Sequence, residues 1–231
     1  MANQLKKVTP KDIVKTTLDH LVYGISGISQ SDKKDLTQSL TRVYNNFRAG
    51  KFLSAFIDEW KKLEQKGKIP DTYSYSEEHF NCLGEILDYL DNEIPNDRVF
   101  EVLKKLFFVS VMDNLINDDN LLPNQYLKII KNLNSGEILV LFSIYRISKS
   151  NYLVDNQSNY TSTDVINKIA ELSNLKHNPL VLLNCEVLEK KRLIHPFFTI
   201  HTSTDIRVLT VTDLGRGLCN YIERYDELVK D

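Results

Sequence analysis

The chain has 231 residues, of which 42% are hydrophobic and 26% are charged, so it can build one large core or two small ones. Its formal charge of −2 provides no overall attraction to nucleic acid or to an anionic membrane, so any DNA binding must come from a local patch. The longest apolar stretches are too short to span a bilayer, and the N-terminus has no apolar signal core. We therefore expect a cytoplasmic protein without a membrane partner.

The first half of the sequence has the periodicity of a helical bundle. Apolar residues recur at three- and four-residue spacing, and the second and third predicted helices form a hairpin with a turn at Gly50. The most apolar segment, from about Asp97, is the expected central buried helix. In chain order, the predicted helices run from Thr9–Pro10 to about Tyr23–Gly24, from about Ser31 to Arg48, from Gly50 through Leu63, from Ser76 through Leu90, from about Asp97 to Asn117, and from Pro123 to about Leu133.

The second half predicts helices followed by a β-hairpin and a closing helix. Two runs rich in β-forming residues flank a polar turn, and Thr212 can cap the last helix. The predicted elements are helices from Ser135 to about Ile147, from Ser162 or Thr163 through Leu172 and from Asn178–Pro179 to about Lys191, strands at 196–200 and 206–212, and a helix after Thr212. This order predicts a mainly α chain, in which an N-terminal helical bundle (1–123) precedes a winged-helix-like domain (124–231) with one β-hairpin.

Two family resemblances are visible in these segments. Leu188-Glu189-Lys190-Lys191-x-Leu193-Ile194, followed by Leu209-Thr210 and Gly215-Arg216, resembles the wing region of MarR-type bacterial repressors, which implies a DNA-binding transcriptional regulator. The segment from Tyr126 to Leu139, preceded by Leu103 to Asp113, is similar to the Abi-alpha family, which implies a role in abortive infection and phage defence. Neither resemblance includes a catalytic signature.

The third helix of the winged segment decides between these implied functions. At 100° per residue, Val181 and Cys185 share the inward face with Leu188. Two leucines and a glutamate on the opposite side suit neither base reading nor phosphate contact, so we expect protein contact or self-association, and hence a homo-oligomer. Arg192 stands where the repressor pattern has a helix-ending glycine. The candidate interaction face consists of Leu182, Leu183 and Glu186, with Pro179 and Lys190 on the same side.

DNA binding is the alternative. A basic ridge along the helix ends and the wing could contact phosphates without reading bases, although the same residues could form a solvated charged rim. The ridge would consist of Lys176, His177, Asn178, Lys190, Lys191, Arg192, His201 and Arg207.

The sequence predicts no catalytic, cofactor or metal site. The acidic segment 113–120 lacks the glycine and glutamate of a calcium loop and is expected to be a solvated turn. Cys185 could be paired with His177 or His195, but it lies on an apolar helix, and the three cysteines (Cys82, Cys185 and Cys219) are expected to be buried free thiols. A third hypothesis is a ligand pocket lined by Trp60, Tyr44 and Phe56, aromatics that could equally fill a core.

Overall fold

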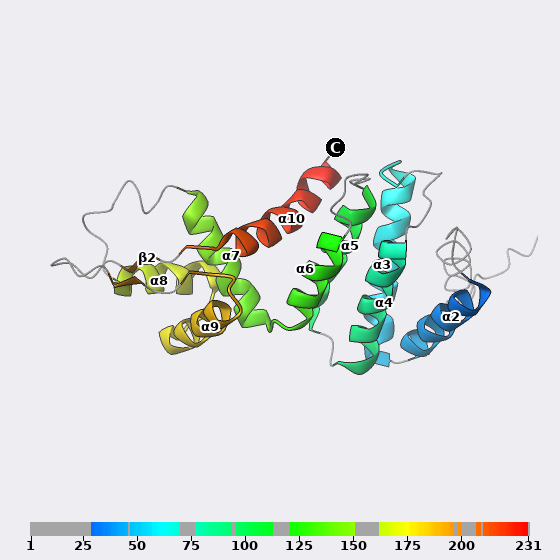
Figure 1. Cartoon of the computed structure of the whole chain (residues 1–231), viewed down its shortest axis with the longest axis horizontal. Helices are drawn as coiled ribbons and strands as arrows, with labels where there is room; N and C mark the ends of the chain where they lie inside the picture. Colours follow the sequence, from blue (N-terminus) through cyan, green and yellow to red (C-terminus); the bar gives the residue numbers. More distant parts are fainter. Residues whose placement is uncertain are drawn as a thin grey trace, which may run out of the picture. The chain divides into compact units, whose positions relative to one another are not determined.

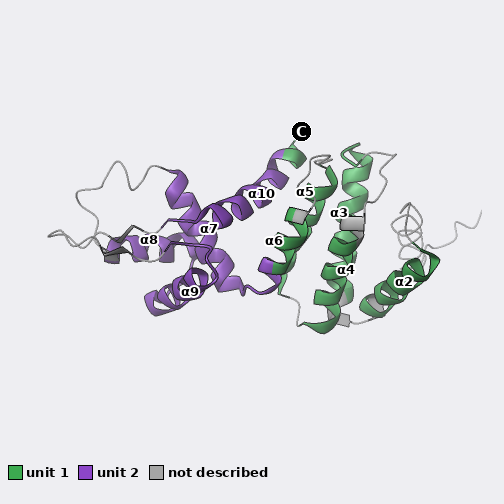
Figure 2. Ribbon diagram, in the orientation of Figure 1, with its two compact units in different colours: residues 1–128, 228–231 green, residues 129–227 purple. Residues whose placement is uncertain are grey.

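The structure is a computed structural model, and it describes residues 29–45, 47–69, 77–93, 96–112, 121–150, 162–195, 198–199, 207–208 and 210–230. The predicted first helix, the acidic segment 113–120 and the turn at 201–205 lie outside the described residues. The chain divides into two compact units, residues 1–128 with 228–231 and residues 129–227 (Figure 2). The sequence-based boundary lies between residues 123 and 124.

Unit 1 is built from helices α2 (Gln30–Asn45), α3 (Phe47–Gln65), α4 (Glu77–Asn92), α5 (Asp97–Met112) and most of α6 (Leu121–Lys131), coloured blue to green in Figure 1. α5 is buried around most of its circumference, as its apolar sequence predicts. α2 and α3 pack against each other as the predicted helical hairpin. The predicted turn at Gly50 is wrong, because Gly50 is buried inside α3 and α2 ends at Asn45.

An aromatic cluster forms the centre of unit 1. Phe56 and Trp60 of α3 lie against Phe107 and Phe108 of α5, with the Phe56 ring 5.1 Å and 5.0 Å from these two rings. Phe56 and Trp60 are 1% and 4% exposed. Of the three residues of the hypothetical ligand pocket, these two therefore fill the core, and the side chain of Tyr44 lies outside the description.

Unit 2 contains α7 (Ser135–Lys149), α8 (Ser162–Ser173), α9 (Asn178–Lys190) and α10 (Asp213–Lys230), together with strands β1 (Phe198–Thr199) and β2 (Arg207–Val208). The sequence also offers Ser135 as the cap of α7, but Ser135 is the first residue of the helix and the cap is Asn134. The Asn134 side chain accepts a hydrogen bond from the backbone amide of Glu137 (2.9 Å), and the Glu137 carboxylate accepts one from the backbone amide of Asn134 (3.2 Å). The cap of α10 is Thr212 as predicted, because its hydroxyl accepts from the Gly215 amide at 3.1 Å.

Polar side chains tie α10 to α7. Lys149 forms an ion pair with Glu223 at 2.8 Å, and the hydroxyl of Tyr145, which has one proton to donate, lies within hydrogen-bond reach of the side-chain oxygens of both Asn220 and Glu223. Burial is the main cause that raises the pKa of Tyr145 above its ordinary value, so the phenol stays a hydrogen-bond donor.

The predicted winged-helix fold class is wrong, although its mainly α part is confirmed. The described residues are predominantly helical, and extended pairing among them is limited to Phe198 with Val208, Thr199 with Arg207 and an isolated bridge between Ile194 and Val211. Strands in globular proteins are usually about five or six residues long, so these two-residue strands do not make a wing. Runs rich in β-forming residues favour strands, but this propensity depends on the surrounding packing and does not by itself specify a sheet.

α9 ends without the glycine that the repressor pattern has at the position of Arg192. Arg192 adopts a left-handed conformation with φ of 59°. The Leu193 amide donates to the Leu188 carbonyl at 2.9 Å, and the Arg192 amide donates to the Glu189 carbonyl at 2.8 Å, which is a Schellman motif. Arg192 thus takes the position that the repressor pattern gives to glycine, at the cost of backbone strain.

Candidate functional site

α9 exposes large apolar side chains on one side. Leu180, Leu182 and Leu183 are 46%, 40% and 55% exposed, whereas Val181, Cys185 and Leu188 are fully buried. Glu186 is also exposed one turn beyond Leu182 and Leu183. We call Leu180, Leu182, Leu183 and Glu186 the α9 face. Three leucines on a short helix form an apolar patch in a place where a solvated helix carries polar residues.

Close packing on its inner side holds α9 in place. The helix packs against α7 and α8 and lies at the edge of unit 2 in Figure 1. Gly136 of α7 lets the two helices approach closely, because a Cβ at this position would lie 3.0 Å from the side-chain amide nitrogen of Asn184 on α9. At the C-terminal end of α9, the Lys191 ammonium donates to the Asn132 carbonyl and lies 3.5 Å from the buried carboxylate of Glu137. The α9 face is therefore carried by a helix that is held at its middle and at its C-terminal end.

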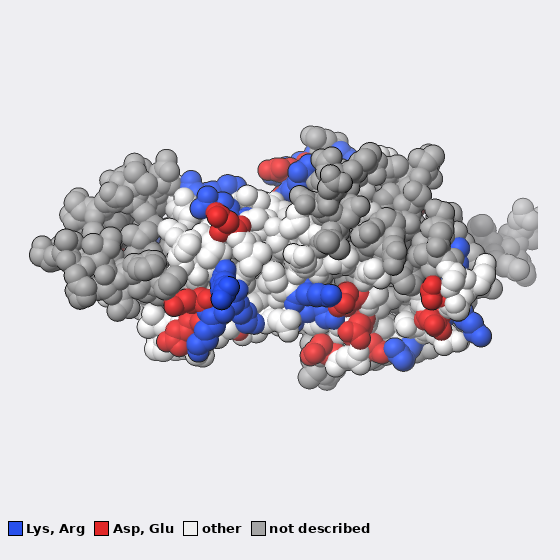
Figure 3. Space-filling model, in the orientation of Figure 1, with Lys and Arg blue, Asp and Glu red and all other residues white. Residues whose placement is uncertain are grey.

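Charged residues lie at both ends of the α9 face. Lys176, just before the helix, and Glu186 are exposed, and neither forms an ion pair within the part of the chain that is described. Lys190, one turn beyond Glu186, is exposed as well. On the surface shown in Figure 3, basic side chains are interspersed with acidic ones rather than gathered into one basic patch.

The described residues of the predicted DNA ridge fall into two groups at opposite ends of α9. Lys176, His177 and Asn178 lie at its start, and Lys190, Lys191 and Arg192 at its end, which for a helix of this length is a separation of about 18 Å. Lys191 is engaged with Asn132 and Glu137. His201 lies outside the described residues, and so does the side chain of Arg207.

A nucleophilic thiol needs an exposed, electropositive environment, and Cys185 has neither property. Cys185 is fully buried; burial first, and then the charges of Glu186 and Glu189, raise its pKa to about 12. A thiol with this pKa stays protonated at neutral pH. His177 and His195 are exposed and flank the two ends of α9.

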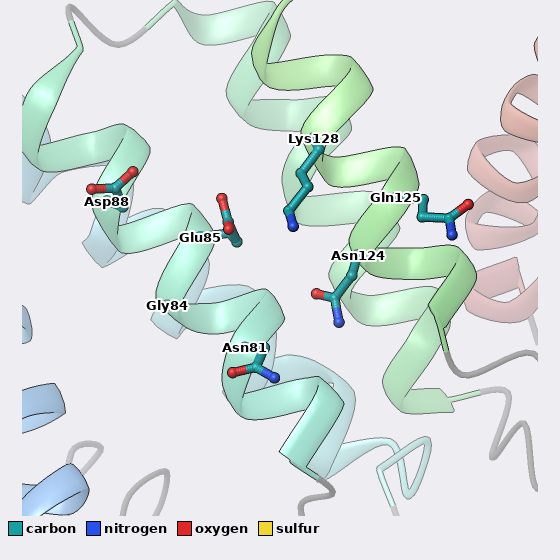
Figure 4. A pocket seen from close by; sticks show the side chains of 7 residues that line it. All are labelled: Asn81, Gly84, Glu85, Asp88, Asn124, Gln125 and Lys128. Carbon is teal, nitrogen blue, oxygen red and sulfur yellow. The ribbon is translucent and has the colours of Figure 1, made fainter.

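A polar groove between α4 and α6 in unit 1 was not predicted from the sequence. It has a volume of about 680 Å³ and is lined by Asn81, Gly84, Glu85, Asp88, Asn124, Gln125 and Lys128. In Figure 4, Glu85 and Lys128 extend toward the groove from opposite walls, while Gln125 points away from it. The Cys82 thiol of α4 donates to the Asn124 side chain of α6 at 2.9 Å, which links the two walls.

The groove offers hydrogen-bonding and charged groups of both signs. Among the described residues, no three His, Cys, Asp or Glu side chains gather into a group that could hold a metal ion. The spacing of Asn81, Glu85 and Asp88 on one side of α4 was the available sequence signal, because a polar stripe at four- and three-residue spacing marks an uncovered face. Its opposite wall depends on α6, about 40 residues later, which no local pattern reveals.

None of the described helices has the length and apolar character needed to cross a membrane. Comparisons with protein-family models, curated proteins and solved structures find no match to this chain. The resemblances to Abi-alpha and MarR-type proteins therefore stay predictions.

Proposed function

We propose that this chain is a non-enzymatic cytoplasmic protein that makes protein contacts through the α9 face, with a second copy of the chain as its partner. The observation that carries the proposal is the exposure of Leu180, Leu182 and Leu183, at 46%, 40% and 55%, on a helix whose other side is fully packed. Complete burial of a leucine stabilises by about 1.5–3 kcal/mol, so covering these three half-exposed side chains would contribute roughly 3 kcal/mol.

Two further features support the proposal. Three free cysteines, all buried, are typical of a reducing compartment such as the cytoplasm. The similarity to the Abi-alpha family implies a role in phage defence, and a protein contact needs no catalytic residues.

The test compares the wild type with a double variant, Leu182→Glu with Leu183→Glu, by size-exclusion chromatography with light scattering over a range of concentrations. Charged residues at the α9 face should hold the variant at 26.7 kDa, while the mass of the wild type rises with concentration. Both side chains are well exposed, so the variant should keep the unfolding midpoint of the wild type in urea.

Leu214→Glu is the matched control. Leu214 is 42% exposed, much like Leu182, but it lies on α10. It should associate as the wild type does. A wild type that stays monomeric at several hundred micromolar, or a double variant that associates equally well, would contradict the proposal. Adding a labelled duplex at low salt tests the DNA alternative, which predicts a complex whose affinity falls steeply with salt.

A further inference from the structure

We infer that α9 pairs antiparallel with α9 of a second copy, about a two-fold axis at the level of Val181. This inference rests on the proposed function and specifies its partner and register. Its basis is the order of the exposed residues, which is basic at Lys176, two residues before the helix, apolar at Pro179, Leu180, Leu182 and Leu183, acidic at Glu186 and basic again at Lys190.

This order is self-complementary only in the antiparallel direction. Glu186 lies five residues after Val181 on α9, and Lys176 lies two residues before the helix begins, so a two-fold axis at Val181 brings Lys176 of each copy to the end of the pair where Glu186 of the other lies. The same operation places Leu183 opposite Pro179 and Leu182 level with Leu180. A two-fold interface requires such a surface, because each residue meets its partner position twice.

A parallel pair would be opposed by its charges. It would place Lys176 against Lys176 and Glu186 against Glu186, and like charges across an interface disfavour association. Within the described residues Lys176 and Glu186 have no ion-pair partner, so both are available to a second copy.

The contact is small, which sets the expected affinity. A 13-residue helix is about 20 Å long and cannot by itself cover the roughly 800 Å² per partner of a standard interface. We therefore expect a weak, concentration-dependent dimer whose dissociation constant is in about the micromolar range or above.

Charge reversal tests the register directly. Lys176→Glu and Glu186→Lys each place two like-charge contacts in the dimer, and each should weaken it about tenfold in sedimentation velocity at low salt. Combining the two reversals restores opposite charges and should return the dissociation constant to within about threefold of the wild type. Lys190→Glu is the control, because α9 begins at Asn178, which this register places opposite Asn184, so Lys190 lies beyond the start of the partner helix and faces no residue of it.

The outcomes separate the inference from the proposed function. If the combined reversal is as weak as the single ones, or if Lys190→Glu weakens the dimer equally, the antiparallel register is overturned. The proposed function would stand in that case, provided that Leu182→Glu with Leu183→Glu still abolishes association. If that apolar double variant associates like the wild type, the α9 face itself is excluded and both ideas fail together.

Discussion

Gly215→Ala should destabilise unit 2 because α10 approaches the chain that leaves α9 too closely for any side chain. A Cβ at residue 215 would lie 2.1 Å from the Leu193 carbonyl oxygen and 3.0 Å from its carbonyl carbon. Both atoms are backbone, and the same oxygen accepts a hydrogen bond from the Thr212 amide at 3.1 Å. The segment around Leu193 cannot move away easily, because its amide closes the Schellman motif and Ile194 pairs with Val211.

The expected cost follows from three contributions. Overpacking of this kind costs about 1–3 kcal/mol, and loss of the Thr212 hydrogen bond adds about 1 kcal/mol. The higher helix propensity of alanine returns up to about 1 kcal/mol, which leaves a net loss of roughly 1–4 kcal/mol. For a unit of this size, the melting temperature should fall by about 5 °C or more.

Urea and thermal unfolding followed by circular dichroism measure this loss. Gly136→Ala is the comparison, because the Cβ there meets the end of the Asn184 side chain at 3.0 Å, which can turn away. It should cost less than Gly215→Ala, and Asn184→Ala should relieve most of the cost. A Gly215→Ala protein as stable as the wild type would refute the described junction between α9 and α10.

Three other predictions concern local backbone and thiol chemistry. Arg192→Gly should stabilise unit 2 by about 0.5–1 kcal/mol in urea unfolding, because Arg192 has φ of 59°, whereas Arg192→Ala should give no such gain; equal effects would argue against the left-handed cap. Gly84→Ala should stabilise unit 1 by up to about 1 kcal/mol, because it lies within α4 and a Cβ there meets nothing within 4 Å; a loss of stability would show that the groove is closed. Burial raises the pKa of Cys185 and Cys219 to about 12, above the ordinary 9.0 of an unfolded thiol. The two thiols therefore contribute to the free energy of unfolding below pH 9, and this contribution is lost as the pH rises from 9 to 12. Thiol titration at pH 8 should accordingly label these two cysteines only after denaturation, and rapid labelling of the native protein would contradict their burial.

Local patterns were sufficient to predict α9 and its orientation. Pro179 at the first turn marked its start, and the periodicity of Val181, Cys185 and Leu188 identified the buried side. Leu180 was not included in the predicted interaction face, although it lies one turn before Leu183. Its exposure depends on how α7 and α8 cover the helix, which the sequence of α9 alone does not determine.

Features that depend on tertiary contacts were harder to predict. Gly50 resembles a turn residue, but its position inside α3 is decided by helix packing. The cap of α7 could have been found, since Asn134 and Glu137 have capping-box spacing. Strand propensity predicts a wing, but this propensity depends on the surrounding packing, and only two residue pairs form a ladder in the described chain.

Sedimentation equilibrium of the wild-type protein is the most direct test of association through the α9 face. The apparent mass should rise from 26.7 kDa toward twice that value between a few micromolar and several hundred micromolar. Leu182→Glu with Leu183→Glu, measured in parallel, should remain at the monomer mass. A constant monomer mass for the wild type, or the same rise in both proteins, would contradict the account.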